Sequence, residues 1–141
     1  MVDILLVEDN PGDVRLLQEV LVDSAFKAEL RVAENGEEAL AMLRGNGSHA
    51  GARRPDLVLL DLNVPRKNGL EVLEEIRADA ALRGIPVVVL TSSTAEDDVS
   101  RSRELEADLY LTKPLGLGRM RGIVSAIENF WRERAGATRG G

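Results

Sequence analysis

Residues 56–69, DLVLLDLNVPRKNG, contain an unbroken apolar run, 57–60, that is followed at once by Asp61. Hydrophobicity that is continuous rather than alternating is typical of a strand covered on both faces, as in a parallel sheet. Pro65 then interrupts the pattern and indicates a turn. The stretch therefore predicts a buried strand with a carboxylate at its carboxyl end.

Other short apolar runs lie on both sides of this stretch. They are ILLV at 4–7, VVVL at 87–90 and DLYL at 108–111, with a weaker run, ELRVA, at 29–33. Helical patterns lie between the runs, first from Pro11 after a predicted N-cap at Asn10, and then at 36–43, 70–82, 95–105 and 116–134. Strand and helix alternate five times, which predicts an α/β domain with right-handed crossovers. We expect one domain over 1–134 and a flexible tail over 135–141.

The composition is that of a globular protein, with 44% hydrophobic and 30% charged residues in a chain of 141. A net charge of −6 and the lack of a helix-turn-helix pattern predict no nucleic-acid partner. No apolar run approaches the roughly 18 residues that cross a bilayer, and no basic leader precedes the first strand, so we expect a cytoplasmic protein without a membrane partner. The absence of cysteine excludes disulfides and thiolate chemistry, and the single histidine leaves little for a zinc site.

Polar side chains follow four of the predicted strands. In open parallel sheets, ligands bind beyond the carboxyl ends of the strands, so residues at these ends share one edge. The residues that the sequence places there are Glu8, Asp9, Asp61, Thr91, Ser92, Thr112 and Lys113. Taken singly, each also has a structural interpretation, as a loop acid, a cap or a solvated lysine. Their conjunction at one edge favours a functional site.

Three carboxylates at one edge raise one another's pKa unless a cation lies among them. Glu8, Asp9 and Asp61 offer oxygen ligands only, which select a hard ion. An open site with few protein ligands suits Mg²⁺ better than Ca²⁺. The sequence therefore predicts Mg²⁺ as the cofactor.

Four stretches together resemble the receiver domain of two-component response regulators, and they span nearly the whole chain. They are ILLVEDN (4–10), DLVLLDLNVPRKNGLEVL (56–73), VVVLTSS (87–93) and ADLYLTKP (107–114). The resemblance implies a flavodoxin-like (βα)5 fold, a three-layer sandwich with strand order 2-1-3-4-5. It also implies a phosphoacceptor signalling protein that acts on no substrate other than its own phosphoryl group.

The same resemblance assigns roles to individual residues. Asp61 matches the phospho-acceptor, Lys113 the lysine that assists it, Thr91 the switch hydroxyl and Tyr110 the aromatic switch residue. The metal ligands would be Glu8, Asp9, Asp61 and the backbone carbonyl of Asn63, with Glu8 standing where many members have Asp. Asn63 and Ser93 match positions that tune the lifetime of the phosphoryl group. The bond between Lys113 and Pro114 is expected to be cis, because a cis bond would aim Lys113 into the site.

Shorter stretches, EDNPGDVRLLQE (8–19), LDLNVPRKNG (60–69), YLTKP (110–114) and IENFW (127–131), are similar to the small regulators paired with phytochrome-type bacterial kinases. The partners implied are a sensor histidine kinase, of the phytochrome-like type, and a downstream protein target. The apolar stripe of the last helix, which includes Phe130 and Trp131, predicts a homodimer through the fourth helix, the fifth strand and the last helix. The fourth helix has only Val99 and Leu105 as large apolar anchors, and we expect it to be the element that moves.

Several alternatives compete with this interpretation. One is a Mg²⁺-dependent phosphatase with an aspartyl nucleophile, for which Asp61-Leu62-Asn63 would be the motif, although a second acid is missing. A flavodoxin-like cofactor binder would need N–H donors to phosphate after the first strand, where this chain has Glu8-Asp9. A pseudo-receiver is disfavoured because every matched position is intact. A phosphorelay intermediate differs from a terminal regulator only in its partner.

Overall fold

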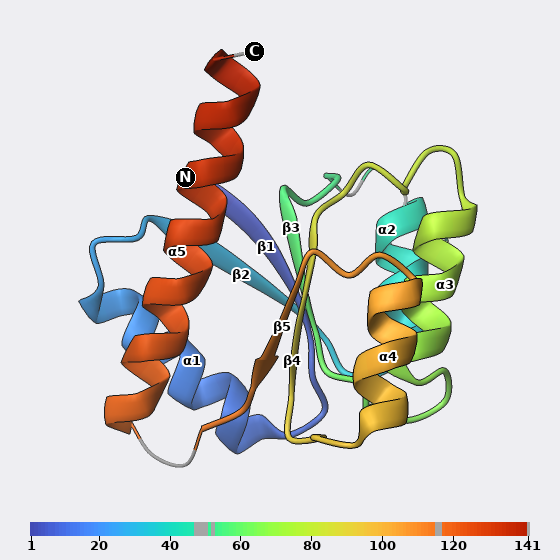
Figure 1. Cartoon of the computed structure of the whole chain (residues 1–141), viewed down its shortest axis with the longest axis horizontal. Helices are drawn as coiled ribbons and strands as arrows, with labels where there is room; N and C mark the ends of the chain where they lie inside the picture. Colours follow the sequence, from blue (N-terminus) through green and yellow to red (C-terminus); the bar gives the residue numbers. More distant parts are fainter. Residues whose placement is uncertain (47–50, 52, 115–116, 141) are drawn as a thin grey trace.

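The computed structural model describes residues 1–46, 51, 53–114 and 117–140. Within these residues the chain forms one sheet of five parallel strands, in the order β2-β1-β3-β4-β5 (Figure 1). The elements follow one another as β1 (Val2–Val7), α1 (Pro11–Asp23), β2 (Ala28–Ala33), α2 (Gly36–Arg44), β3 (Leu57–Leu60), α3 (Gly69–Ala78), β4 (Val87–Thr91), α4 (Glu96–Glu104), β5 (Leu109–Thr112) and α5 (Leu117–Gly140). The flavodoxin-like fold and its strand order are therefore confirmed.

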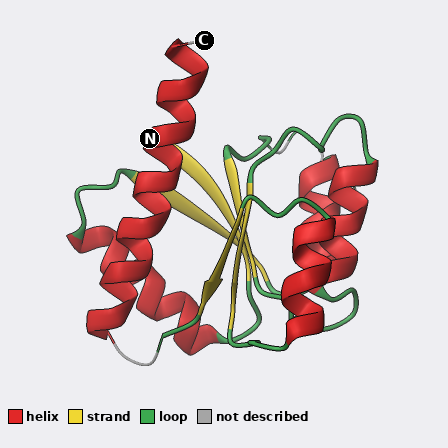
Figure 2. Cartoon of the chain, in the orientation of Figure 1, coloured by secondary structure: helices red, strands yellow, loops and turns green. Residues whose placement is uncertain are grey.

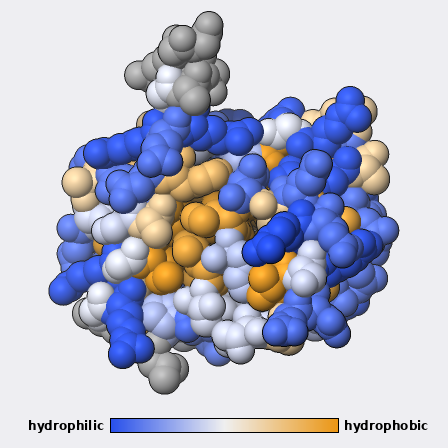
Figure 3. Space-filling model, in the orientation of Figure 1, coloured by the Kyte–Doolittle hydropathy of each residue, from blue (hydrophilic) through white to orange (hydrophobic). Residues whose placement is uncertain are grey.

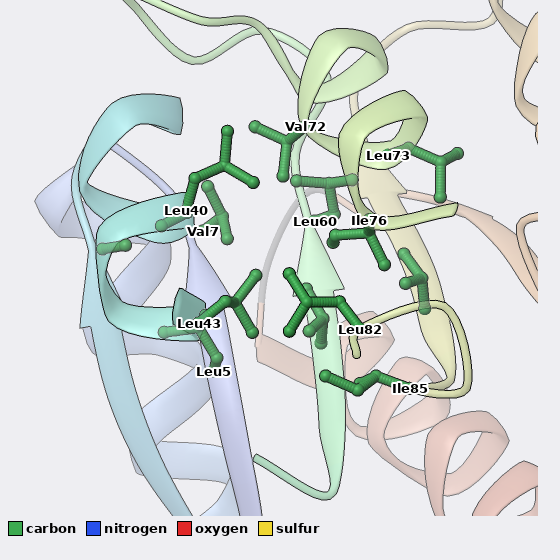
Figure 4. Close-up of a cluster of buried hydrophobic side chains, with 14 of the residues drawn as sticks. Leu5, Val7, Leu40, Leu43, Leu60, Val72, Leu73, Ile76, Leu82 and Ile85 are labelled. Carbon is green, nitrogen blue, oxygen red and sulfur yellow. The ribbon is translucent and has the colours of Figure 1, made fainter. Parts of the chain in front are cut away.

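Helices cover both faces of the sheet, which makes three layers. α1 and α5 lie on one face, and α2, α3 and α4 lie on the other (Figure 1). The central strands β1, β3 and β4 are buried on both faces, which explains why their sequences are continuously apolar. Figure 4 shows the core beneath α2 and α3, where Leu40 and Leu43 of α2 and Val72 and Ile76 of α3 meet Leu60.

Side-chain caps fix the starts of α1 and α3, the two helices that follow the strands carrying Glu8 and Asp61. The side chain of Asn10 caps α1 by accepting from the amides of Gly12 and Asp13, as expected. Asn68 and Glu71 form a capping box at the start of α3. Gly69, the first residue of α3, packs against the backbone at the end of β3. A Cβ at this position would lie 2.4 Å from the carbonyl oxygen of Asp61. The loop after β3 is therefore held against the strand end that carries Asp61.

Two helices, α3 and α5, end several residues away from the predicted positions, whereas α2 and α4 end within one residue of them. α3 ends at Ala78 rather than at 82, because the amide of Asp79 caps it and the chain then turns through bonds from the amides of Leu82 and Arg83 to the Asp79 carbonyl. α5 continues to Gly140, through most of the segment predicted to be a tail, and projects past the sheet (Figure 1). Gly141 lies outside the described residues, and the flexibility of 135–141 stays a prediction.

Arg77 ties α3 to the connection between α4 and β5. Its guanidinium donates to the carbonyl of Glu106 at 3.2 Å and 2.9 Å and to Asp108 Oδ2 at 3.1 Å. Glu106 has a φ of 62°, a left-handed conformation that is uncommon for residues other than glycine. The same Asp108 oxygen accepts from the amide of Val87 at 2.8 Å, so this contact also includes the start of β4. These bonds anchor the C-terminal end of α4 at the amino edge of the sheet.

No helix in the described part of the chain is long and apolar enough to cross a membrane.

Candidate phosphoryl-acceptor site

The carboxyl ends of the strands meet at one edge of the sheet, the lower edge in Figure 2, where loops lead into the helices. The register pairs Val7 with Leu60, so Glu8 and Asp61 emerge side by side from the two central strands. Farther along the same edge, Thr91 at the end of β4 pairs with Thr112 at the end of β5. Lys113 is the next residue and lies just beyond β5. Glu8, Asp61 and Thr91 are 3%, 4% and 0% exposed, whereas Asp9 is exposed.

The Asp61 carboxylate accepts bonds from three directions. Its Oδ1 accepts from the Thr91 hydroxyl at 2.8 Å and from the amide of Asn63 at 3.0 Å. Its Oδ2 accepts from Lys113 Nζ at 2.6 Å. A buried carboxylate with three donors is both held in place and stabilised as an anion.

Lys113 lies among three carboxylates. It pairs with Glu8, with Asp61 and, at 2.9 Å, with Asp13 Oδ2. The described residues contain no cis peptide bond, so the bond before Pro114 is trans, and the expectation of a cis bond was wrong. The flexible side chain of Lys113 reaches Asp61 from the trans backbone, so the contact that motivated the expectation forms without it.

The electrostatics of the site differ from residue to residue. Burial raises the pKa of Glu8 to about 7, against the opposing effect of Lys113. Burial would also raise the pKa of Asp61, but the amide of Asn63, Lys113 and Thr91 together outweigh it and lower that pKa. Burial disfavours the charged form of Lys113, yet its contacts with the three carboxylates raise its pKa. At neutral pH the arrangement thus favours an ionised Asp61 beside a charged Lys113.

Glu8, Asp9 and Asp61 each place a carboxylate oxygen within 4.8 Å of the other two. Three oxygen ligands that converge from two strand ends fit a hard divalent cation, and such a cation would relieve the repulsion between these like charges. The residues therefore fit a metal site, as the sequence indicated.

The predicted switch residues form a continuous chain of contacts. The amide of Ser93 lies 3.4 Å from the Thr91 hydroxyl, and the carbonyl of Ser93 accepts from the Tyr110 hydroxyl at 2.7 Å. Ser93 Oγ donates to Asp98 in the first turn of α4. Thr91, Tyr110 and the start of α4 are thereby linked through Ser93. The side chain of Asn63 is exposed, and the backbone amide of this residue is the group that contacts Asp61.

Sequence reasoning missed two residues of this site. Asp13 was not among the predicted site residues, although its carboxylate reaches Lys113. Asp98 was not predicted to contact the site either, although its carboxylate accepts from Ser93 Oγ. The available signal was that Asp13 lies in the first turn of the helix that follows Glu8 and Asp9 after a single N-cap residue, so the chain keeps it near the same edge of the sheet.

A doubly wound sheet of order 2-1-3-4-5 that brings an acidic pair, a bonded aspartate, a threonine and a lysine to its carboxyl edge defines the receiver class of signalling proteins. The profile of the family described as "Response regulator receiver domain" matches residues 4–125, so the chain belongs to this family. It is thus a response regulator of two-component signalling, and the matches favour this assignment over an aspartyl phosphatase.

Individual relatives show which response regulators this chain is similar to. The response regulator Rcp1 of Synechocystis sp. is 49% identical over 130 residues, which cover 92% of this chain and 88% of Rcp1. The crystal structure of the Mn²⁺-bound form of Rcp1 matches with a TM-score of 0.86 at 48% identity, over 93% of this chain and 94% of that one. The phosphorylated cyanobacterial phytochrome response regulator RcpA matches with a TM-score of 0.87 at 49% identity, over 92% and 93% of the two chains. The chain is therefore a response regulator similar to Rcp1 and RcpA.

Proposed function

We propose that this chain accepts a phosphoryl group on Asp61 from a sensor histidine kinase and signals through protein–protein contacts that depend on that group. The environment of Asp61 carries the proposal. Its carboxylate is buried at the ligand-binding edge of the sheet, its pKa is lowered, and a lysine, a threonine and a backbone amide surround it. A relative of similar sequence has been crystallised in a phosphorylated form.

Phosphoryl transfer requires positioning and charge neutralisation more than covalent help from the protein. A carboxylate oxygen of Asp61 bonds to phosphorus as the bond from phosphorus to the nitrogen of phosphohistidine, or to the acetate oxygen of acetyl phosphate, breaks and the leaving group departs. The lowered pKa of Asp61 keeps this nucleophile unprotonated. Lys113, now 2.6 Å from Asp61, neutralises charge on the transferred oxygens. Glu8, Asp9, Asp61 and the Asn63 carbonyl would hold Mg²⁺, whose charge would add to this neutralisation.

The switch follows from the contacts of Thr91. Its hydroxyl now bonds Asp61, and we expect it to follow the phosphoryl group, because a hydrogen bond to a charged group contributes roughly 1.5–3 kcal/mol. Ser93 would move with it and release or redirect Tyr110. Asn63, whose backbone amide contacts Asp61, and Ser93, whose backbone amide contacts Thr91, would tune the lifetime of the phosphoryl group.

α4 is the element on which the switch acts. Ser102 is its only buried residue, and its N-cap position, Ala95, makes no side-chain bond, so the helix is thinly packed. The contact between Ser93 and Asp98 connects its first turn to the site. We expect faster amide hydrogen exchange in the first turns of α4 after phosphorylation, and equal exchange in both forms would contradict this role.

The partners are a sensor histidine kinase of the phytochrome type and a protein target, without nucleic acid. We also propose a homodimer through α4, β5 and α5. Figure 3 shows hydrophobic side chains gathered at the centre of this face, between α5 and α4, and Leu109, Leu111 and Ile123 are only partly buried. Phosphodonor should raise the dimer fraction in sedimentation, and Leu111→Glu should lower it. A protein that stays monomeric at high concentration with phosphodonor would refute the dimer.

The proposed function is tested by intact mass after incubation with acetyl phosphate and Mg²⁺. The wild-type chain should gain the mass of one phosphoryl group, and Asp61→Asn should not. Asp56→Asn is a matched control, because Asp56 precedes the same strand at the opposite edge of the sheet. Equal phosphorylation of Asp61→Asn would refute the assignment. Transfer profiling against phytochrome-type and unrelated kinases then tests the partner.

A further inference from the structure

Asp13 brings a fourth carboxylate to the site from a different element. It lies in the first turn of α1, where the side chain of Asn10 accepts from the amides of Gly12 at 2.9 Å and of Asp13 at 3.2 Å. This cap fixes the first turn, and the Asp13 carboxylate reaches Lys113 Nζ at 2.9 Å. Asp13 is not one of the three acids that converge as a metal cluster among the described residues.

A lysine ammonium has three N–H donors. Glu8, Asp13 and Asp61 all pair with Lys113, so its donors are fully engaged. A phosphoryl oxygen can therefore bond Lys113 only when one of these carboxylates gives way. Asp13 is the most accessible of the three, with a side chain 36% exposed against 3% for Glu8 and 5% for Asp61.

The charge of Asp13 acts on the same group that Lys113 must bind. Its oxygen and that of Asp61 lie 2.9 Å and 2.6 Å from one nitrogen, so a phosphoryl group on Asp61 comes close to the Asp13 carboxylate. Like charges at such separations repel appreciably even in a partly solvated site. The Asp13 carboxylate therefore has two effects. It occupies one N–H donor of Lys113, and it repels an anion that approaches Lys113.

We infer that Asp13 is a positioning residue that holds Lys113 and slows the transfer of a phosphoryl group to Asp61 from free anionic donors. The inference rests on the proposed function of Asp61. In the step concerned, an Asp61 oxygen bonds to phosphorus while the bond from phosphorus to the acetate oxygen breaks and acetate leaves. A docked kinase holds its phosphohistidine at the site, so the repulsion by Asp13 lowers mainly the encounter rate of donors that diffuse freely.

The test compares Asp13→Asn with the wild-type chain in phosphorylation by acetyl phosphate, at Mg²⁺ concentrations that saturate both proteins. Asparagine keeps the size and an oxygen that can accept from Lys113 but removes the charge. We expect the rate to rise about tenfold, which is the lower end of the range of electrostatic steering. The gain should shrink at high salt because mobile ions screen the exposed charge. It should also be smaller with phosphoramidate, whose protonated nitrogen lowers the net charge of the donor.

Asp23→Asn is the matched control, since it removes the same charge at the far end of α1 and should leave the rate unchanged. Asp13→Ala is a second variant that also removes the contact with Lys113, and it should likewise accelerate transfer. If Asp13 served only as a first-turn acid, Asp13→Asn would lower the melting temperature and leave both rates and their salt dependence unchanged, which would overturn the inference.

The two proposals fail differently. If the wild-type chain takes up phosphoryl on Asp61 but Asp13→Asn does so at the same rate, the role of Asp13 is wrong and the proposed function stands. If the wild-type chain takes up none, or if Asp61→Asn takes up as much, both are wrong.

Discussion

Replacement of Lys113 by methionine tests whether the lysine holds the acidic cluster together. The side chains of Lys113, Glu8 and Asp61 are 13%, 3% and 5% exposed, so this is a buried ion-pair cluster. Removal of one partner from a buried pair costs about 3–5 kcal/mol, because the other charge stays buried without compensation. Methionine retains most of the apolar stem, which limits the loss of packing. In metal-free buffer we expect Lys113→Met to lose about this amount of unfolding free energy.

The pH dependence of the loss has a definite sign. The pKa of Glu8 in the folded protein is about 7, above its ordinary value of 4.5. A carboxyl with a raised folded-state pKa stabilises the native state in its protonated form, and this stability declines as the pH rises from about 4.5 through 7. Lys113 is one of the groups that lower the pKa of Glu8, so its removal raises that pKa further. The deficit of Lys113→Met should therefore be larger at pH 8 than at pH 6.

Urea unfolding, followed by the fluorescence of the single tryptophan, Trp131, and by circular dichroism, measures this loss. Lys67→Met is a matched control, because Lys67 pairs with Glu75 at side-chain exposures of 38% and 30%, where an ion pair contributes about 1 kcal/mol or less. Mg²⁺ should restore part of the stability of Lys113→Met, because a cation again neutralises the cluster. A deficit no larger than that of Lys67→Met, or one that is the same at both pH values, would refute the reasoning.

Two further substitutions separate the switch from the metal site. Thr91→Val keeps the shape of a fully buried side chain but removes its bond to Asp61, so we expect a loss of roughly 1.5–3 kcal/mol that Thr91→Ser largely avoids. Phosphorylated Thr91→Val should also lack the change in α4 exchange, and a wild-type change would contradict the role of the hydroxyl. Mg²⁺ at 100 times its Kd should stabilise the wild-type chain by about 2.7 kcal/mol in thermal melts. Glu8→Gln should bind Mg²⁺ more weakly, and an equal stabilisation would remove Glu8 from the ligands.

The sheet could be predicted from the sequence because its central strands are buried on both faces. Runs such as 57–60 are apolar without interruption, and their short length and the polar or turn residues that flank them favour a strand over a buried helix. The convergence of Glu8, Asp61, Thr91 and Lys113 followed from the rule that parallel strands end at one edge, and the structure brings these residues together.

The remaining features depend on contacts that sequence periodicity does not encode. The bond between Asp13 and Lys113 joins residues 100 positions apart and depends on how the first turn of α1 is aimed. The end of α3 is set by a backbone cap at Asp79 rather than by a helix-breaking residue. The geometry at Pro114 was inferred from resemblance alone, whereas the reach of a lysine side chain makes a trans bond sufficient.

The anchor at Arg77 determines how α4 can respond. Its guanidinium clamps the backbone of Glu106 just after the helix, while the opposite end of α4 is connected to the site through Ser93 and Asp98. A helix that is fixed at one end and displaced at the other rotates about its fixed end instead of translating along its axis. We therefore expect the displacement to grow along α4 toward the acceptor site, so that a partner docked over its first turn would sense the largest change.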